Sequence, residues 1–164
     1  MGKVFSRTML VLIAVFVFFY QSILSTAIAN ENTTRVAVTS KVVDFVDRIT
    51  ETGILTCQEY ETFIRYLDST GVLFKVTLEH QHQSISPSTA GDDVVSSWVL
   101  VGKEAVLDEL YTSGSYHFAK GDLINVTVVN QTNTVATVLK LQGIGADVLH
   151  TITAKHGGTI RDER

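Results

Sequence analysis

The 164-residue sequence predicts an α+β fold: a membrane helix that continues into an amphipathic helix, a second helix, and then a small, mostly antiparallel sheet with short helices. Three observations predict it. An apolar stretch of membrane length lies near the amino terminus, two stretches with helical apolar spacing follow it, and period-two alternation appears only afterwards. Helices that precede strands, rather than alternating with them, favour α+β over a doubly wound α/β fold.

Charge divides the chain into residues 1–29 and an expected extracytoplasmic domain of residues 30–164. The first segment carries Lys3 and Arg7 and no acid, whereas the rest carries eleven basic and seventeen acidic residues. A nucleic-acid-binding protein needs a basic face to neutralise phosphates, and the acidic domain lacks this bias. We therefore expect no nucleic-acid partner. A disulfide framework is excluded because the chain has a single cysteine.

Two interpretations of the first segment stay open. A basic start, the apolar run Met9–Tyr20 and the small residues of Ala27–Ala29 are typical of a cleaved signal peptide. The run Met9–Ala29 also suits a retained membrane helix, because at 1.5 Å per residue it spans about 30 Å, the thickness of the hydrocarbon core. Either way, Lys3 and Arg7 stay in the cytosol and the domain lies outside the cytoplasm. A buried core helix fits less well, since the segment is apolar on all sides.

The stretch from Thr33 to Thr52 is predicted to be an amphipathic helix. Its apolar residues at i, i+3, i+4 and i+7 are Val42, Phe45, Val46 and Ile49. Gly53 is a suitable C-terminal stop. No proline separates this helix from the apolar segment, so both can form one long rod.

A second helix is predicted from the capping box Thr56–Glu59 to a stop at Gly71. The same apolar spacing recurs at Tyr60, Phe63, Ile64 and Leu67. With a tight turn at Gly53, the two helices are expected to pack as a hairpin or corner.

The rest of the chain predicts strands and short helices. The expected strands are 74–82, 94–101, 116–118, 123–129 and 147–155. Expected short helices cover 103–111 and 134–142, the latter with Val135, Val138 and Leu139 facing inward. The stretch 84–93, with the only proline, is expected to be a loop, and Gly157–Gly158 a turn.

Candidate chemistry is sparse. His80 and His82 share one face of a strand and need a further ligand, such as Glu79 or His117, to bind zinc; Glu79 points the opposite way. The pattern therefore favours ordinary, partly exposed strand histidines. Cys57 lies in the first turn of a helix, which tends to lower a thiol pKa, but no histidine accompanies it. We predict no catalytic residue, no cofactor, no metal site and no small-molecule substrate, and hence no enzyme.

An ordered set of motifs resembles a known group. The set comprises the stretch 45–56, then Tyr60, Phe63 and Leu67, then Ser69–Gly71, the strand through His80, the turn 120–122 before a strand, and Gly157–Gly158. It resembles short TadE-type, pilin-like proteins that Gram-positive bacteria encode beside tight-adherence (Tad) type pilus or secretion components. Unlike many pilin precursors, the chain has no acid before Glu31.

The resemblance implies a single-pass cell-membrane protein with a structural role in pilus or secretion assembly. Its implied partners are the lipid bilayer, through residues 9–29, and other pilin-like or platform membrane proteins. Small residues pack membrane helices together, so we expect a contact face comprising Ser22, Ser25, Thr26 and Ala29. The alternatives are a secreted or anchored cell-surface binding module without catalysis and, less favoured for want of a catalytic constellation, an envelope enzyme.

Overall fold

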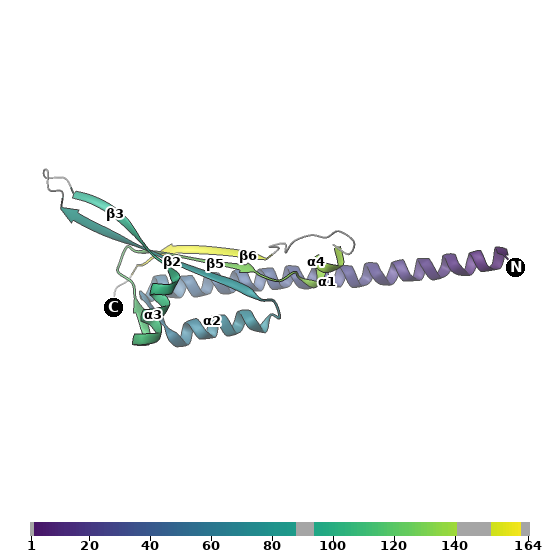
Figure 1. Cartoon of the computed structure of the whole chain (residues 1–164), viewed down its shortest axis with the longest axis horizontal. Coiled ribbons are helices and arrows are strands. Elements are labelled where there is room, and N and C mark those ends of the chain that lie inside the picture. Colours follow the sequence, from purple (N-terminus) through teal and green to yellow (C-terminus); the bar gives the residue numbers. More distant parts are fainter. Residues whose placement is uncertain (1, 88–93, 141–151, 162–164) are drawn as a thin grey trace.

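The computed structural model describes residues 2–87, 94–140 and 152–161. One long helix, α1 (Gly2–Thr52), runs through most of the molecule, and all other elements gather around its carboxyl-terminal part or project beyond it (Figure 1). Those elements are, in chain order, β1 (Ile54–Thr56), α2 (Cys57–Ser69), β2 (Phe74–Pro87), β3 (Val94–Val101), α3 (Lys103–Ser113), β4 (Ser115–His117), β5 (Leu123–Asn130), α4 (Val135–Lys140) and β6 (Thr153–Thr159). The predicted α+β class is confirmed.

The apolar segment and the amphipathic helix form one continuous helix, as the absence of proline allows. Its predicted inner face is buried: Val42, Phe45, Val46 and Ile49 are all at most 6% exposed. The helix ends at Gly53, which has a φ of 68° and whose N–H donates to the Ile49 carbonyl at 2.8 Å. A residue with a side chain would be strained at this positive φ, so glycine suits the stop.

Helix α2 folds back along α1, and the predicted hairpin and capping box are both present. The Thr56 side chain accepts from the Glu59 N–H at 3.3 Å, while the Thr56 N–H donates to the Glu59 carboxylate at 3.2 Å. The rings of Phe45 and Phe63 stack with centroids 4.3 Å apart, which joins the two helices. Arg48 adds an ion pair to Glu59 at 2.7 Å.

Among the described residues, the main sheet has the order β3-β2-β5-β6, with every neighbouring pair antiparallel. The long strand β2 changes partner along its length: Phe74–Gln81 pairs with β5, and His80–Pro87 pairs with β3. The β2–β3 hairpin therefore projects beyond the body (Figure 1). The expected loop at 84–93 is wrong for 84–87, where the strand continues to Pro87. A proline is tolerated at a strand end, because it gives up only a terminal ladder hydrogen bond. Residues 88–93 lie outside the described residues.

The core lies between α1 and the sheet, with α2 and α3 closing it. Strand β5 alternates as predicted, with Ile124, Val126 and Val128 fully buried. They join the buried face of α1 and residues of α2 and α3 in one apolar cluster. The sheet is thus fixed to the carboxyl-terminal half of α1 by hydrophobic burial.

The expected turn at Gly157–Gly158 is wrong, because both glycines lie inside β6. A Cβ at Gly158 would lie 2.7 Å from Cγ2 of Thr50 on α1, and one at Gly157 would collide with the Asn125 side chain. The glycines are needed for close approach of the edge strand to the helix rather than for a turn. Hydrogen bonds close the same contact, since the Arg161 N–H donates to the Thr50 carbonyl at 2.8 Å.

Helix α4 begins one residue later than expected, and two of its three residues predicted to face inward, Val135 and Val138, face outward instead, whereas Leu139 is partly buried. Val135 and Val138, predicted to point inward, are 70% and 49% exposed, while Ala136 and Thr137 are buried. Thr134 explains this orientation: its Oγ1 accepts from the Thr137 N–H at 3.2 Å and donates to Glu31 of α1 at 2.6 Å. Polar anchoring therefore turns the apolar valines outward. Part of the expected 134–142 helix, and most of the expected 147–155 strand, lie outside the described residues.

Candidate functional site

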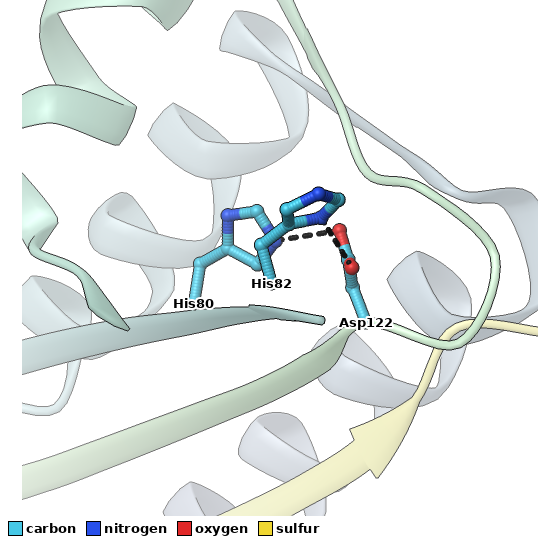
Figure 2. A group of neighbouring side chains, drawn as sticks. All are labelled: His80, His82 and Asp122. Atoms are coloured by element: carbon cyan, nitrogen blue, oxygen red, sulfur yellow. Dashed lines mark hydrogen bonds and ion pairs between the residues drawn. The ribbon is translucent and has the colours of Figure 1, made fainter. Parts of the chain in front are cut away.

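Three titratable side chains meet where the hairpin leaves the body. His80 and His82 come from β2, at the point where its partner changes from β5 to β3, and Asp122 comes from the residue just before β5. Figure 2 shows both imidazoles turned toward the carboxylate. We call His80, His82 and Asp122 the histidine–aspartate cluster.

Both oxygens of Asp122 are engaged by imidazole nitrogens. His80 Nε2 lies 2.7 Å from Oδ2, and His82 Nδ1 lies 2.7 Å from Oδ1. A carboxylate only accepts hydrogen bonds, so each of these nitrogens carries a proton and donates. In the neutral tautomer of His80, Nδ1 then accepts from the Tyr116 hydroxyl at 2.9 Å.

The cluster is buried at one end and open at the other. His80 and Asp122 are 4% and 2% exposed, whereas the side chain of His82 is 47% exposed. Burial alone would raise the pKa of Asp122, but hydrogen bonds from His80, from the Ala119 N–H at 3.0 Å and from His82 outweigh it, so its pKa is lowered. The carboxylate is thus held in its charged form inside the protein.

Aromatic rings and a tight turn set the position of His80 and Asp122. His80 lies edge to face with Tyr116 and Phe118, at centroid distances of 5.7 and 4.9 Å. Burial, followed by Glu109 and Asp122, raises the pKa of Tyr116, which keeps its hydroxyl protonated. The Ile160 N–H donates to the Asp122 carbonyl at 2.8 Å, so the end of β6 fixes the turn that carries the carboxylate.

The sequence pointed to the wrong third residue. Glu79 lies on the opposite side of β2 from His80, and His117 is exposed, with its Nε2 3.3 Å from the Ser115 hydroxyl. The expectation of ordinary, partly exposed histidines is wrong for His80, which is buried. The alternation of buried and exposed residues along β5 predicts that Asp122, two residues before Ile124, also faces inward. This signal in the sequence could have identified the third residue, since Asp122 and Ile124 share the buried face.

The pKa of the Cys57 thiol is shifted in the opposite direction from the one that its position at a helix start suggested. Its pKa is raised, first by desolvation and then by Glu61, whose Oε1 lies 3.6 Å from the thiol sulfur. Desolvation, the larger cause, and then the neighbouring carboxylate act against the lowering of the pKa that a helix start favours. A raised pKa leaves less of the Cys57 thiol in the reactive thiolate form.

The predicted contact residues lie on the outer surface of α1. Ser22, Ser25, Thr26 and Ala29 are all exposed, and the Thr26 hydroxyl donates to the Ser22 carbonyl at 3.0 Å. Ser22 and Thr26 also line a cavity of about 570 Å³ together with Thr134 and other residues around α4. Part of the predicted contact face is therefore directed toward α4 of the same chain.

Among the helices of the described residues, α1 alone is long and apolar enough to cross a membrane. No residue of its most apolar stretch is buried in the protein. A buried core helix is thereby excluded for this segment, whereas a signal sequence passes the same test. Comparison of the chain with protein-family models, with curated proteins and with solved structures finds no match.

Proposed function

We propose that the protein is a membrane-anchored, extracytoplasmic structural or assembly subunit of a Tad-like pilus or secretion system, acting without catalysis. The observation that carries the proposal is the continuity of α1. Its amino-terminal part is apolar and exposed, with Phe16 and Phe18 more than 70% exposed, while its other end forms part of the core. Such a rod places one end in lipid or among neighbouring helices and holds a folded domain at the other.

Contacts on both sides of Ala29 favour a retained anchor over a cleaved signal peptide. Before this position, the Tyr20 hydroxyl donates to the Leu139 carbonyl of α4 at 2.9 Å; after it, Glu31 accepts from Thr134 at 2.6 Å. Cleavage after Ala29 would remove the first contact and divide the surface on which α4 rests. We infer that residues 1–29 stay attached to the domain.

The same contacts indicate how deep the helix sits. Glu31 and the Thr134 hydroxyl that binds it belong outside the hydrocarbon, because a carboxylate is costly to place there. The hydrocarbon core therefore ends before Glu31. The segment Met9–Ala29, which follows Lys3 and Arg7, then spans about 30 Å. Exposed Val135 and Val138 of α4 would contact the outer interface.

Single-cysteine crosslinking in the producing cells' membranes tests the subunit role. Cysteines are placed at Ser22, Ser25, Thr26 and Ala29 in a Cys57→Ser background, with Ile23 and Asn30 as matched exposed controls on the same helix. We expect crosslinks at the four small-residue positions and few at the controls. Absence of crosslinks, or crosslinks without helical periodicity, would overturn the proposal. Genes for a secretion ATPase and a polytopic platform protein beside this one would support it.

One observation favours the alternative of a cell-surface binding module. The projecting hairpin exposes Trp98 and Leu100, which are 50% and 62% exposed on its edge strand β3. Rigid aromatic side chains on a projecting element are common in binding surfaces. In this alternative, Trp98→Ala abolishes adhesion to cell-wall material, while crosslinking along α1 does not depend on helix position. In the subunit proposal, Trp98→Ala leaves the crosslinking pattern unchanged.

A further inference from the structure

We propose that the histidine–aspartate cluster is a binding site for a divalent transition-metal ion of the zinc class. It offers three ligand atoms from three residues, His80 Nε2, His82 Nδ1 and an Asp122 oxygen, and these atoms lie within 4.8 Å of one another. Imidazole nitrogen with carboxylate oxygen suits zinc and its first-row neighbours, whereas calcium and magnesium prefer oxygen ligands alone. The inference is independent of the proposed subunit role.

The geometry needs only a small adjustment. Zinc–nitrogen and zinc–oxygen bonds are about 2.0–2.2 Å long, so two tetrahedral ligand atoms are about 3.4 Å apart. The nitrogens of His80 and His82 now lie 2.7 Å from the carboxylate oxygens. An ion that replaces the two shared protons would separate each of these pairs by less than about 1 Å, and would bring the two imidazole nitrogens, which lie within 4.8 Å of each other, closer by at most about 1.4 Å. His82, half exposed at the open end, is the side chain with room to move.

Outer groups already hold the buried ligands in position. If a metal occupies His80 Nε2, the Nδ1–H donates to the Tyr116 oxygen, 2.9 Å away, and this fixes both tautomer and ring orientation. The Ala119 N–H does the same for the Asp122 carboxylate at 3.0 Å. Such outer hydrogen bonds accompany metal-ligating histidines in most known sites.

The position of the cluster suggests what the ion would do. Three protein ligands leave one coordination position for water or for a group from another molecule, and the exposed side of His82 provides entry. The ion would tie β2 to the turn before β5, and through the Asp122 carbonyl to the end of β6. Binding would therefore stiffen the root of the projecting hairpin.

Metal titration of the full-length, untagged chain tests the site. The protein, in detergent and with Cys57→Ser to remove its thiol, is stripped with a chelator and titrated with Zn²⁺ by calorimetry, and with Co²⁺ by visible absorption. We expect one ion per chain and the visible bands of a nitrogen–oxygen-ligated Co²⁺. His82→Ala and Asp122→Asn should each weaken Zn²⁺ binding at least tenfold. Tyr116→Phe should weaken it by about tenfold, through loss of the outer hydrogen bond.

Two histidines supply the matched controls: His117 is exposed, and His156 is partly exposed and lies beside Asp47. His117 and His156 lie outside the cluster, so His117→Ala and His156→Ala should bind Zn²⁺ like the parent. Because His82 is largely exposed, His82→Ala decides the question even if Asp122→Asn fails to fold. No stoichiometric binding by the parent, or equal binding by His82→Ala, would overturn the proposal and leave the cluster a purely hydrogen-bonded one. Either result leaves the crosslinking test of the subunit role unaffected.

Discussion

The two halves of α1 are one helix in two environments. From Met9 to Phe19 the large apolar side chains are exposed, whereas Val38, Val42, Val46 and Ile49 are at most 2% exposed. Both stretches are rich in apolar residues, but only the second alternates them with polar ones. The comparison teaches that the period of the apolar pattern, not its strength, decides which half packs on the sheet.

The largest expected effect comes from charging the exposed half. Val15→Asp combined with Phe18→Asp should release the chain from the membrane, because each aspartate near a helix centre costs about 2.5–3.5 kcal/mol for insertion. Membrane fractionation and carbonate extraction measure the release. The matched control is Val36→Asp, a 69% exposed position on the same helix beyond the apolar segment. It should stay in the membrane, and equal behaviour of the two variants would contradict the division of α1.

Truncation of the packed half should act on folding instead. Ile49→Ala removes a side chain that is 2% exposed in the core, and we expect it to lower the free energy of unfolding by about 2–5 kcal/mol. Ile13→Ala is the matched control, since Ile13 is 52% exposed and has no core contact to lose. Denaturant unfolding of the full chain in detergent measures both. Similar destabilisation by the two variants would show that the halves are not distinct.

A smaller effect is expected where β6 approaches α1. Gly158→Ala places a Cβ 2.7 Å from Thr50 Cγ2, and overpacking of this kind costs about 1–3 kcal/mol. Gly102→Ala, whose Cβ meets nothing within 4 Å, should lower the melting temperature less, because it loses only the preference of the α3 N-cap for glycine over alanine. Adding Thr50→Ser removes the opposing methyl group and should restore part of the loss. If Thr50→Ser restores no stability, the destabilisation by Gly158→Ala does not arise from the contact with Thr50.

The smallest effect concerns the thiol at the start of α2. Since desolvation and then Glu61 raise the pKa of Cys57, its alkylation at pH 8 should be slower than that of an ordinary exposed thiol. Glu61→Gln removes one of these causes and should speed the reaction. Iodoacetamide labelling followed by mass spectrometry measures the rates. A faster parent than variant would contradict the assigned role of Glu61.

The sequence was most informative where a local pattern determines structure. The helical spacing around Phe45 and Phe63, the capping box at Thr56 and the alternation of β5 were all predicted correctly. Errors arose where a distant partner decides. Gly158 lies within a strand because Thr50 occupies the space beside it, and α4 is turned by the bond from Thr134 to Glu31. Neither contact leaves a local signal.

The candidate site shows the same limit. The two histidines could be placed on one face of a strand, because strand periodicity is local. Asp122 follows His80 by 42 residues, and Tyr116 follows it by 36, so only the fold brings them together. The partner change along β2 that opens the cluster to solvent depends on two separate strand pairings.

The intact mass of the membrane-bound protein tests the central claim most directly. If α1 is one helix that anchors the domain, the chain extracted from washed membranes of the producing cells retains residues 1–29 and has the full mass of 18.0 kDa, apart from any change to its first methionine. A shorter chain that begins at Asn30 and is found in the medium would contradict the anchored account.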